Sequence, residues 1–479
     1  MSALLIRGAT ILTLDSGDRV IEDGHVLVHD GVIAAVGDGD AVAEPGMRVI
    51  EGRGLLLAPG LVNAHTHSQS STLSGFGDRL SHPAFMWLTQ AHTARRTPDE
   101  TRLAVLLTAW AALSTGTTAL IDHFPGQRFS SADIEAALSA WHETGMRAVL
   151  GLRFFDGEFA DIFPTPGVLA PAMMAALQEV ELLRPQPLGE LRELADDAIR
   201  RWHGRDGRIG VFPAPSNPDR CSDAALLLCA ELAERYDTGI HTHLLETQKQ
   251  ATLAQARYGT TTVAHLRELE VLSDRWSCAH CVWLSEADIG LMVQADAVAV
   301  LCPESNARLG VGTAAIPAMR NAGMRLALGT DGSGANDNQS MHEAMRAAAT
   351  LHRAGLTERG DWVSARQALA MATIGGAAAL RQQKVGAIAP GWAADLVLYR
   401  LDHPAWTPLN DPPCQMVFSE SGSAVETVIV AGEVLLDGGR PTRFDPMALA
   451  QEIRAMAVSL RRRNADLFAV ATAIAERVP

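Results

Sequence analysis

The stretch LLLAPGLVNAHTH (residues 55–67) combines an apolar run, a Pro-Gly pair and two histidines one residue apart. The apolar residues predict a short buried strand that ends at His65 and His67. Side chains at positions i and i+2 of a strand point to the same face, so the two imidazoles lie side by side. Such a pair suits a metal ion, although two histidines on a surface loop give the same letters. The rest of the chain decides between these interpretations.

Seven further strand-like segments follow, and helical patterns separate most of them. They read TALIDHF, AVLGLRF, RIGVFPAP, GIHTHLLE, WSCAHCVWL, AVAVLCP and RLALGTD. The first intervening helix has clear boundary signals: Thr97 and Glu100 form a capping box around Pro98, and Gly116 follows its end. Eight strands that alternate with helices predict an α/β fold, a (β/α)8 TIM-like barrel. In that fold the active site lies at the C-terminal ends of the strands.

Short strands and turns precede and follow this region. We therefore expect a small composite β-sandwich domain built from both chain ends, with its first part in residues 1–57 and its second part in residues 385–442. The barrel then occupies residues 58–384. Residues 443–479 place apolar residues at helical spacing, which predicts a C-terminal helical segment. This segment would cover the small domain or contribute to a dimer.

Composition narrows the class of protein. The chain has 479 residues, of which 47% are hydrophobic and 20% charged, typical of a soluble globular protein with more than one domain. A net charge of −15 argues against nucleic acid or an anionic membrane as a main partner. We see no signal peptide and no apolar run of about 18 residues. Six cysteines are few for this length, which favours a cytoplasmic protein without a disulfide framework.

Metal-binding residue types lie at the predicted C-terminal ends of four of the eight strands. They are His65 and His67, then His241, His243 and Glu246, then His280, and finally Asp331. A single strand histidine is more often a core or surface group, but joint placement at one barrel end is hard to reach by chance. Imidazoles with one carboxylate form a common zinc or iron site with room for water. Bound to zinc, that water has a pKa near ~7 and becomes a nucleophile. Glu246 and His280 are placed to border it without binding the metal.

The chain resembles the amidohydrolase superfamily, and within it the aminohydrolase branch of S-adenosylhomocysteine deaminases, guanine-type deaminases and triazine hydrolases. The motifs that carry the resemblance are PGLVNAHTH, HTHLLET, AHCVWLS, CPESN and LALGTDG, with GWAADLVL and VIVAGEVLLDG in the C-terminal β part. They span nearly the whole chain in matching order and spacing. The resemblance implies that one divalent metal is bound by His65, His67, His243 and Asp331.

The resemblance also implies hydrolytic deamination of an aminated nitrogen heterocycle, such as a purine, pterin, pyrimidine or triazine. Water attacks the amino-bearing ring carbon and ammonia leaves. Glu246 would carry a proton from the water to the ring nitrogen, and His280 would orient the water and stabilise the developing charge. Asp331 would take a proton from the water as well as bind metal. His241 points into the barrel and would support the ligands.

Lysine content bears on the number of metals. The chain has only two lysines, Lys249 and Lys384, and none lies between His67 and His243. Superfamily members with two metals usually bridge them through a carbamylated lysine on strand four, which is impossible here. A glutamate bridge stays open, although the end of RIGVFPAP offers no clear candidate. We therefore expect one divalent metal per chain, zinc, with iron or manganese as alternatives that the same ligands suit. The resemblance further implies a homodimer or a larger homo-oligomer.

The sequence departs from many relatives around the expected pocket. The segment VFPAPSNPDRCSD lacks the histidine and tyrosine of their Pro-His-x-Pro-Tyr motif, and TLSGFGD stands where they have Leu-Arg-Gly. These departures leave the substrate open and argue against S-adenosylhomocysteine deaminase activity. Position at the barrel mouth selects the candidates for substrate contact, and an arginine there suits a carbonyl or anionic edge. These candidates are Trp87, His123, Arg153 and Asn306, with His82 and Ser305 beside them.

Three alternatives stay open. The same site could displace chloride, an alkylamine or an S-methyl group from such a ring, and the product then distinguishes the reactions. It could hydrolyse an amide or carbamate, against which the pairing of Glu246 with His280 argues. The chain could also be a non-catalytic scaffold or binding protein, against which the complete set of ligand positions argues.

Overall fold

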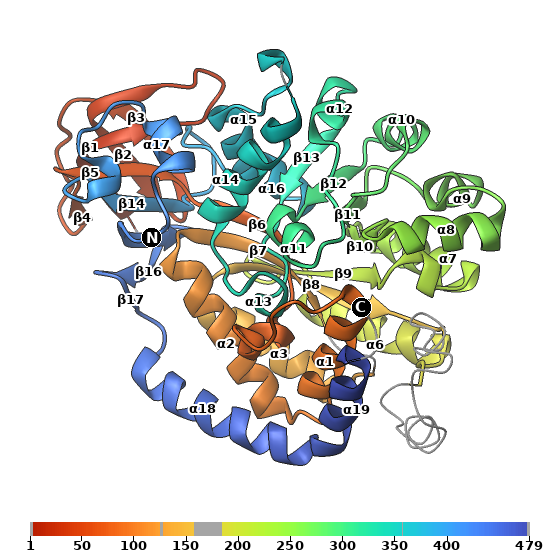
Figure 1. Ribbon diagram of the computed structural model, residues 1–479. Coiled ribbons are helices and arrows are strands. Elements are labelled where there is room, and N and C mark those ends of the chain that lie inside the picture. Colours follow the sequence, from red (N-terminus) through yellow and green to blue (C-terminus); the bar gives the residue numbers. More distant parts are fainter. Residues whose placement is uncertain (1–2, 125–127, 158–183, 357, 477–479) are drawn as a thin grey trace.

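The computed structural model describes residues 3–124, 128–157, 184–356 and 358–476. Eight parallel strands form the centre of the molecule (Figure 1), and hydrogen bonds group them into two four-stranded sheets, β6 to β9 and β10 to β13. The strands are β6 (Leu61–Thr66), β7 (Thr117–Phe124), β8 (Arg147–Phe154), β9 (Ile209–Pro215), β10 (Ile240–Leu244), β11 (Trp276–His280), β12 (Val298–Leu301) and β13 (Arg325–Leu328). Each overlaps one of the eight predicted strands.

The two sheets meet at both edges and close a barrel. At one seam the His243 N–H donates to the Ser216 carbonyl over 3.3 Å, and at the other the Asp331 N–H donates to the His65 carbonyl over 2.9 Å. Gly329 permits the second approach, because a Cβ there would lie 2.7 Å from the Cβ of His65. The (β/α)8 fold is therefore confirmed, and residues predicted to bind metal form its seams.

Four neighbouring barrel strands are buried along their whole length. Every residue of β6, β7, β8 and β9 is buried, as expected for parallel strands with helices outside and packed side chains inside. One interior cluster joins β6, β7, β8, β9, β12 and β13 through small and branched side chains such as Val62, Ala119 and Val149. A rigid packed core therefore supports the strand ends.

Helices alternate with these strands and cover the barrel (Figure 1). The predicted capping box of Thr97 and Glu100 is present, and α2 runs from Pro98 to Ser114. The helices before the C-terminal segment are α1 (His82–Thr93), α2 (Pro98–Ser114), α3 (Ser131–Thr144), α6 (Leu188–Trp202), α7 (Asp223–Arg235), α8 (Gln248–Tyr258), α9 (Thr262–Glu268), α10 (Glu286–Gln294), α11 (Pro303–Arg308), α12 (Ile316–Asn321), α13 (Ser333–Asn336), α14 (Met341–Thr350), α15 (Ala365–Ala370), α16 (Gly376–Ala379) and α17 (Pro412–Phe418).

Both chain ends contribute to a separate β unit, as predicted. Its strands are β1 (Ala3–Leu12), β2 (Val20–His29), β3 (Val32–Asp38), β4 (Arg48–Glu51), β5 (Leu55–Pro59), β14 (Leu396–Arg400), β15 (Val425–Val430), β16 (Glu433–Asp437) and β17 (Arg440–Pro441). Hydrogen bonds link them into one continuous sheet, in which β5 pairs with β1 on one side and β14 on the other. The sheet buries a hydrophobic cluster of its own. The residue boundaries between the domains stay a prediction.

The C-terminal segment forms two helices, α18 (Pro446–Arg463) and α19 (Ala465–Ala475). They are separated at Asn464, whose side-chain amide donates to the Ala94 carbonyl over 2.8 Å. Residues of α18 pack against α2, and those of α19 pack against α1. The expected cover over the small domain is therefore wrong, because the apolar faces of both helices fit the barrel helices. None of the helices in the described ranges combines the length and apolarity that a membrane span requires.

Candidate metal centre and active site

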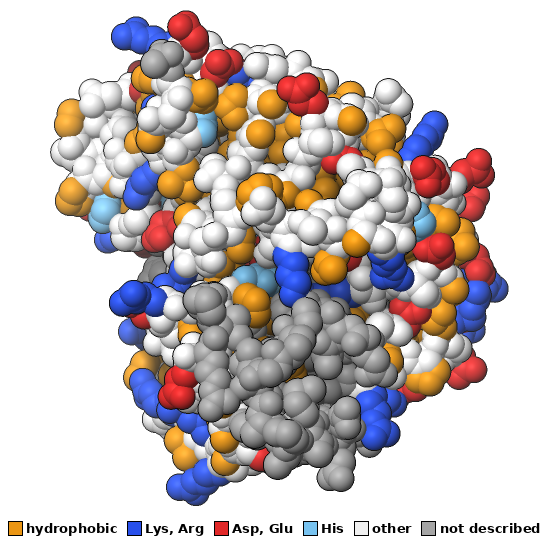
Figure 2. Space-filling view, turned by 45° about the vertical axis from the view of Figure 1, so that its right-hand side comes forward, with side chains coloured by type: hydrophobic (Ala, Val, Ile, Leu, Met, Phe, Trp, Pro, Cys, Tyr) orange, Lys and Arg blue, Asp and Glu red, His pale blue; other side chains and the backbone are white. Residues whose placement is uncertain are grey.

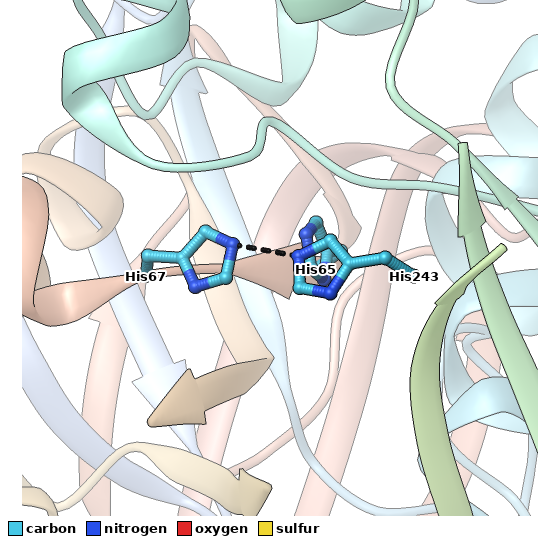
Figure 3. Close-up of side chains that lie close together, drawn as sticks. All are labelled: His65, His67 and His243. Carbon is cyan, nitrogen blue, oxygen red and sulfur yellow. Dashed lines mark hydrogen bonds between the residues drawn. The ribbon is translucent and has the colours of Figure 1, made fainter. Parts of the chain in front are cut away.

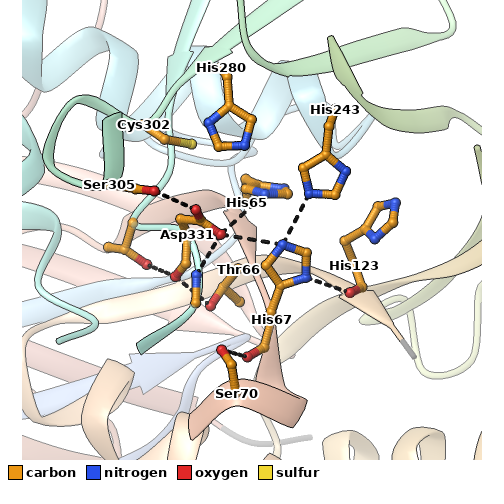
Figure 4. A network of polar contacts seen from close by, with 12 residues as sticks. His65, Thr66, His67, Ser70, His123, His243, His280, Cys302, Ser305 and Asp331 are labelled. Atoms are coloured by element: carbon orange, nitrogen blue, oxygen red, sulfur yellow. Dashed lines mark hydrogen bonds and ion pairs between the residues drawn. The ribbon is translucent and has the colours of Figure 1, made fainter. Parts of the chain in front are cut away.

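The predicted ligands converge at the C-terminal ends of β6, β10 and β13 (Figures 3 and 4). The Nε2 atoms of His67 and His243 are 3.1 Å apart. Asp331 Oδ1 lies 3.3 Å from His67 Nε2 and 3.6 Å from His65 Nε2. Ligands about 2.0 Å from a tetrahedral zinc ion are separated by about 3.3 Å, so these spacings match such a centre.

Hydrogen bonds to carbonyls orient two of the imidazoles. His67 Nδ1 donates to the His123 carbonyl over 2.8 Å, and His243 Nδ1 donates to the Ser216 carbonyl over 2.6 Å. Burial lowers the pKa of His243 well below its usual value, so its ring is neutral. With the proton on Nδ1, its Nε2 presents a lone pair toward His67. A cation between the two rings would accept this lone pair, because neutral imidazole nitrogens are metal ligands.

The third imidazole is oriented by a chain of hydrogen bonds. Ser277 Oγ donates to the Ile240 carbonyl and accepts from His241 Nδ1 over 2.8 Å. His241 Nε2 therefore accepts from His65 Nδ1, 2.8 Å away. This leaves His65 Nε2 as a buried acceptor with no hydrogen-bond partner among the described residues. Burial also lowers the pKa of His65 to about 4, which keeps the ring neutral and able to bind a metal.

Asp331 is fixed as an anion. Ser305 Oγ donates to its Oδ2 over 2.6 Å and the Gly332 N–H donates to its Oδ1 over 2.7 Å. Burial alone raises the pKa of this carboxyl, but its close approach to the imidazoles of His65 and His67 outweighs burial and holds the pKa far below the usual range. Its φ of +61° is left-handed, a conformation that costs an L residue roughly 1–2 kcal/mol.

The residues present therefore fit one divalent metal. Three imidazole nitrogens lie close enough together to bind one ion, and an ionised carboxylate approaches two of them. One of these nitrogens, His65 Nε2, has no hydrogen-bond partner among the described residues. A second close group, His65 with His280 and Cys302, fits less well. Burial raises the pKa of the Cys302 thiol well above its usual value, so the sulfur stays protonated and is a poor ligand.

Glu246 and His280 lie beside this centre, as predicted. His82 Nε2 approaches Glu246 Oε2 to 3.2 Å, and His280 Nε2 lies 3.9 Å from the same oxygen. Burial by itself raises the pKa of Glu246, but His280 and His82 lower it to about 2, so the carboxylate is ionised and able to accept a proton. Asn306 Oδ1 accepts from His280 Nδ1 over 3.0 Å and fixes that ring.

A pocket of about 60 Å³ opens onto these groups. The strand ends supply His67, Arg153, Ser216, His243, Glu246, His280 and Asp331, and α1 supplies the opposite wall with His82, Phe85, Met86, Thr89, Gln90 and Thr93. In the space-filling view, histidine atoms are visible near the middle of the face with Lys or Arg side chains beside them (Figure 2). The wall from α1 leaves the catalytic groups only partly accessible.

The predicted substrate contacts divide into two groups. Arg153 lines the pocket, as His82 does. Trp87, His123 and Asn306 are not among its lining residues. Trp87 packs in a hydrophobic cluster with α19, because the outer side of α1 is covered by that helix. His123 lies behind the ligands, with its ring 4.6 Å from that of His243, and Asn306 faces His280.

Several supporting residues were missed from the sequence. Ser216 accepts from His243 through its carbonyl and from Arg153 through its hydroxyl. Gln339 accepts from Thr66 over 2.8 Å and donates to the Asp331 carbonyl over 3.1 Å. The only signal for Ser216 is the altered strand-four motif, and for Gln339 it is the polar run after GTDG. Neither signal indicates which residue Ser216 or Gln339 would hydrogen-bond.

Comparison with known proteins fits this geometry. Residues 56–435 match the family model described as "Amidohydrolase family". The chain belongs to the amidohydrolase family. An amidohydrolase named 5-methylthioadenosine/S-adenosylhomocysteine deaminase from Nitratidesulfovibrio vulgaris is 34% identical over 459 residues, which cover 94% of this chain and 95% of the relative. One of the same name from Pelotomaculum thermopropionicum is 32% identical, over 97% of this chain and 100% of the relative.

Two solved structures that hold zinc share the fold. An atrazine chlorohydrolase from Arthrobacter aurescens, complexed with zinc, matches with a TM-score of 0.85 at 26% identity, over 95% of this chain and 100% of the other. An adenosine deaminase from Xanthomonas campestris with bound zinc matches with a TM-score of 0.83 at 28% identity, over 96% and 99%. The expected family and fold are confirmed.

Replacing Asp331 tests the ligand assignment. We expect Asp331→Ala to lower the zinc content after mild purification by at least ~10-fold and to abolish hydrolysis, because one of four donors is removed. Elemental analysis of the folded protein measures the zinc. The exposed Asp437 supplies the control, and Asp437→Ala should keep the ion. Full zinc content in Asp331→Ala would contradict the assignment.

A half-buried acid behind the site, Glu304, generates a pH prediction. Glu304 precedes Ser305 on α11, and burial together with the neighbouring Glu343 raises its pKa from 4.5 to about 8. The folded chain therefore holds a proton that the unfolded chain releases, and the free energy of unfolding falls as pH rises through this window. We expect Glu304→Gln to reduce the fall in Tm between about pH 5 and about pH 9, measured by thermal denaturation. A slope equal to that of the wild type and of the exposed control Glu193→Gln would count against it.

Proposed function

We propose that this amidohydrolase uses one divalent metal, zinc, to remove the amino group of an aminated nitrogen heterocycle by hydrolysis. The observation that carries the proposal is the placement of Glu246 and His280 on one side of the four predicted ligands, in a pocket closed by α1. A carboxylate and an imidazole at this place can move protons at the attacked ring carbon. The named activities of the curated relatives support the same reaction.

The metal, when bound by His65, His67, His243 and Asp331, supplies Lewis-acid activation of water. The side chains then divide the proton transfers. Glu246 Oε2 accepts a proton from the attacking water and gives it to the ring nitrogen. Asp331 takes the second proton and returns it to the leaving amino group, so ammonia departs and a ring carbonyl remains. His280, held by Asn306, orients the water and stabilises the developing charge.

A second reaction has one observation in its favour. The structural match to an atrazine chlorohydrolase covers nearly the whole chain, and its name indicates chloride as the leaving group. The ligand set and Glu246 would serve that displacement equally, because the water attacks the same kind of ring carbon. Ammonia release therefore decides between the two reactions. A homo-oligomeric state and a cytoplasmic location stay predictions.

The direct test is ammonia release by the zinc-loaded protein across amino-purines, pterins, pyrimidines and triazines. We expect release from one ring class, with the ring carbonyl as the second product. Chloride or an alkylamine released from substituted triazines, with no ammonia from any ring, would replace deamination by the second reaction. Loss of substrate without either product would contradict both.

Replacing Glu246 tests the proton path. We expect Glu246→Gln to keep the zinc content of the wild type and to lower kcat by at least ~100-fold, because an amide cannot accept the proton. Steady-state kinetics on the best ring substrate and elemental analysis measure the two effects. The exposed Glu231 offers a matched control, and Glu231→Gln should retain the wild-type rate. Retained turnover in Glu246→Gln would remove this residue from the path.

A further inference from the structure

His82 contacts the carboxylate that the proposed reaction uses for proton transfer. Its Nε2 lies 3.2 Å from Glu246 Oε2, whereas His280 Nε2 lies 3.9 Å from the same oxygen. The first distance is within the range of a hydrogen bond between nitrogen and oxygen, and the second is beyond it. An ionised carboxylate only accepts hydrogen bonds, so His82 Nε2 carries a proton and donates to Glu246. His82 is therefore the nearer of the two imidazoles that flank this oxygen.

Both side chains of this pair are shielded from solvent. The side chain of His82 is 11% exposed and that of Glu246 is 8% exposed. A hydrogen bond to a charged group is stronger in such surroundings than at the surface, where water and salt screen it. An ionised carboxylate offers about four acceptor sites, so the bond from His82 leaves others for the proton of the attacking water. The bond can therefore fix the direction of the carboxylate without blocking its chemistry.

The position of His82 is set by α1 and not by the barrel. His82 is the first residue of α1, the helix that lines the pocket opposite the strand ends. The outer side of this helix, with Trp87 and Ala91, packs in a hydrophobic cluster with α19. Glu246 follows β10 on the barrel. The bond between His82 and Glu246 therefore joins the wall of the pocket to the group that carries the proton.

His82 also stands at the boundary between two cavities. It lines the catalytic pocket of about 60 Å³, as Glu246 does, and it lines a neighbouring cavity of about 430 Å³. A carboxylate that turned toward the larger cavity would be hydrated there and would point away from the reacting ring. A hydrogen-bond donor at the boundary opposes this turn.

We propose that His82 is a positioning residue for the hydrolysis: its Nε2–H holds Glu246 Oε2 in the catalytic pocket, so that the carboxylate is in place for both of its proton transfers. This inference rests on the proposed deaminase function for the role of Glu246. It adds to the site a residue of α1 that lies outside the sequence motifs of the family resemblance. The docking of α1 over the strand ends then completes the proton path.

Steady-state kinetics of the zinc-loaded chain on its best ring substrate test this role. We expect His82→Leu to lower kcat by at least ~10-fold and to change KM by less than about threefold, because a misplaced proton carrier slows the chemical step and leaves binding intact. His82→Gln should return kcat to within about threefold of the wild type, since its amide N–H can donate to the same oxygen. The control is His142→Leu, which removes a partly exposed imidazole of α3 that lies 2.7 Å from Asp206, and it should keep the wild-type kcat.

The Glu246→Gln background separates positioning from a structural role. The proton path is already lost there, so His82→Leu should change the residual kcat by less than about threefold, because residues of one path give non-additive losses. A substitution that merely damaged the fold would lower the residual rate by the same factor as in the wild type. Zinc content is measured for each variant. If His82→Leu loses the metal or the fold, His82→Asn takes its place, since its shorter amide does not reach Glu246.

A thermal cycle measures the contact without any substrate. The losses in Tm of His82→Leu and Glu246→Leu should not add, and the double variant should lose at least ~2 °C less than their sum. Additive losses would show that the two side chains are not coupled and would overturn the inference.

An unchanged kcat in His82→Leu would also overturn it, as would a loss that His82→Gln does not repair or an equal loss in the Glu246→Gln background. A rise in KM alone would make His82 a substrate-binding group and would count against positioning too. Ammonia release by the wild-type chain is scored separately. Ammonia with any of these results sinks only this inference, whereas coupled losses in Tm without ammonia from any ring support the contact and sink only the deaminase proposal.

Discussion

Hydrogen bonds from the Nδ1 atoms of three histidines determine the arrangement of the whole site. His65 donates to His241, His67 to the His123 carbonyl and His243 to the Ser216 carbonyl. Each bond turns an Nε2 lone pair toward the same point, where Asp331 brings a negative charge. Lone pairs that face one another in a buried place are unfavourable without a cation. The strands that carry these groups must therefore keep fixed positions, and the barrel satisfies that requirement.

The sequence was informative where a rule of parallel sheets applies. C-terminal strand ends gather at one end of a barrel, so the order of the strands was enough to bring His67, His243 and Asp331 together. Helix α2 was equally readable, because its capping box involves residues three apart. The single sheet built from both chain ends could also be predicted, because the same pattern of short apolar strands and turns occurs before and after the barrel region.

Contacts between segments far apart in the chain could not be predicted from the sequence. Trp87 reads as a residue of the barrel mouth, yet α19 covers it, and that packing joins segments far apart in the sequence. His82 reaches Glu246 only because α1 lies over the strand ends. The break at Asn464 depends on the Ala94 carbonyl, which no local pattern indicates. In each case the deciding partner lies on another element.

The seam between β13 and β6 couples folding to the supply of metal. The Asp331 N–H donates to the His65 carbonyl there, so two predicted ligands also hold the first and last barrel strands together. An ion that binds only the closed form stabilises it by RT ln(1 + [M]/Kd), which is about 4 kcal/mol at a thousandfold excess over Kd. A metal bound at the predicted ligands would thus raise the free energy of unfolding of the closed chain, independently of any substrate.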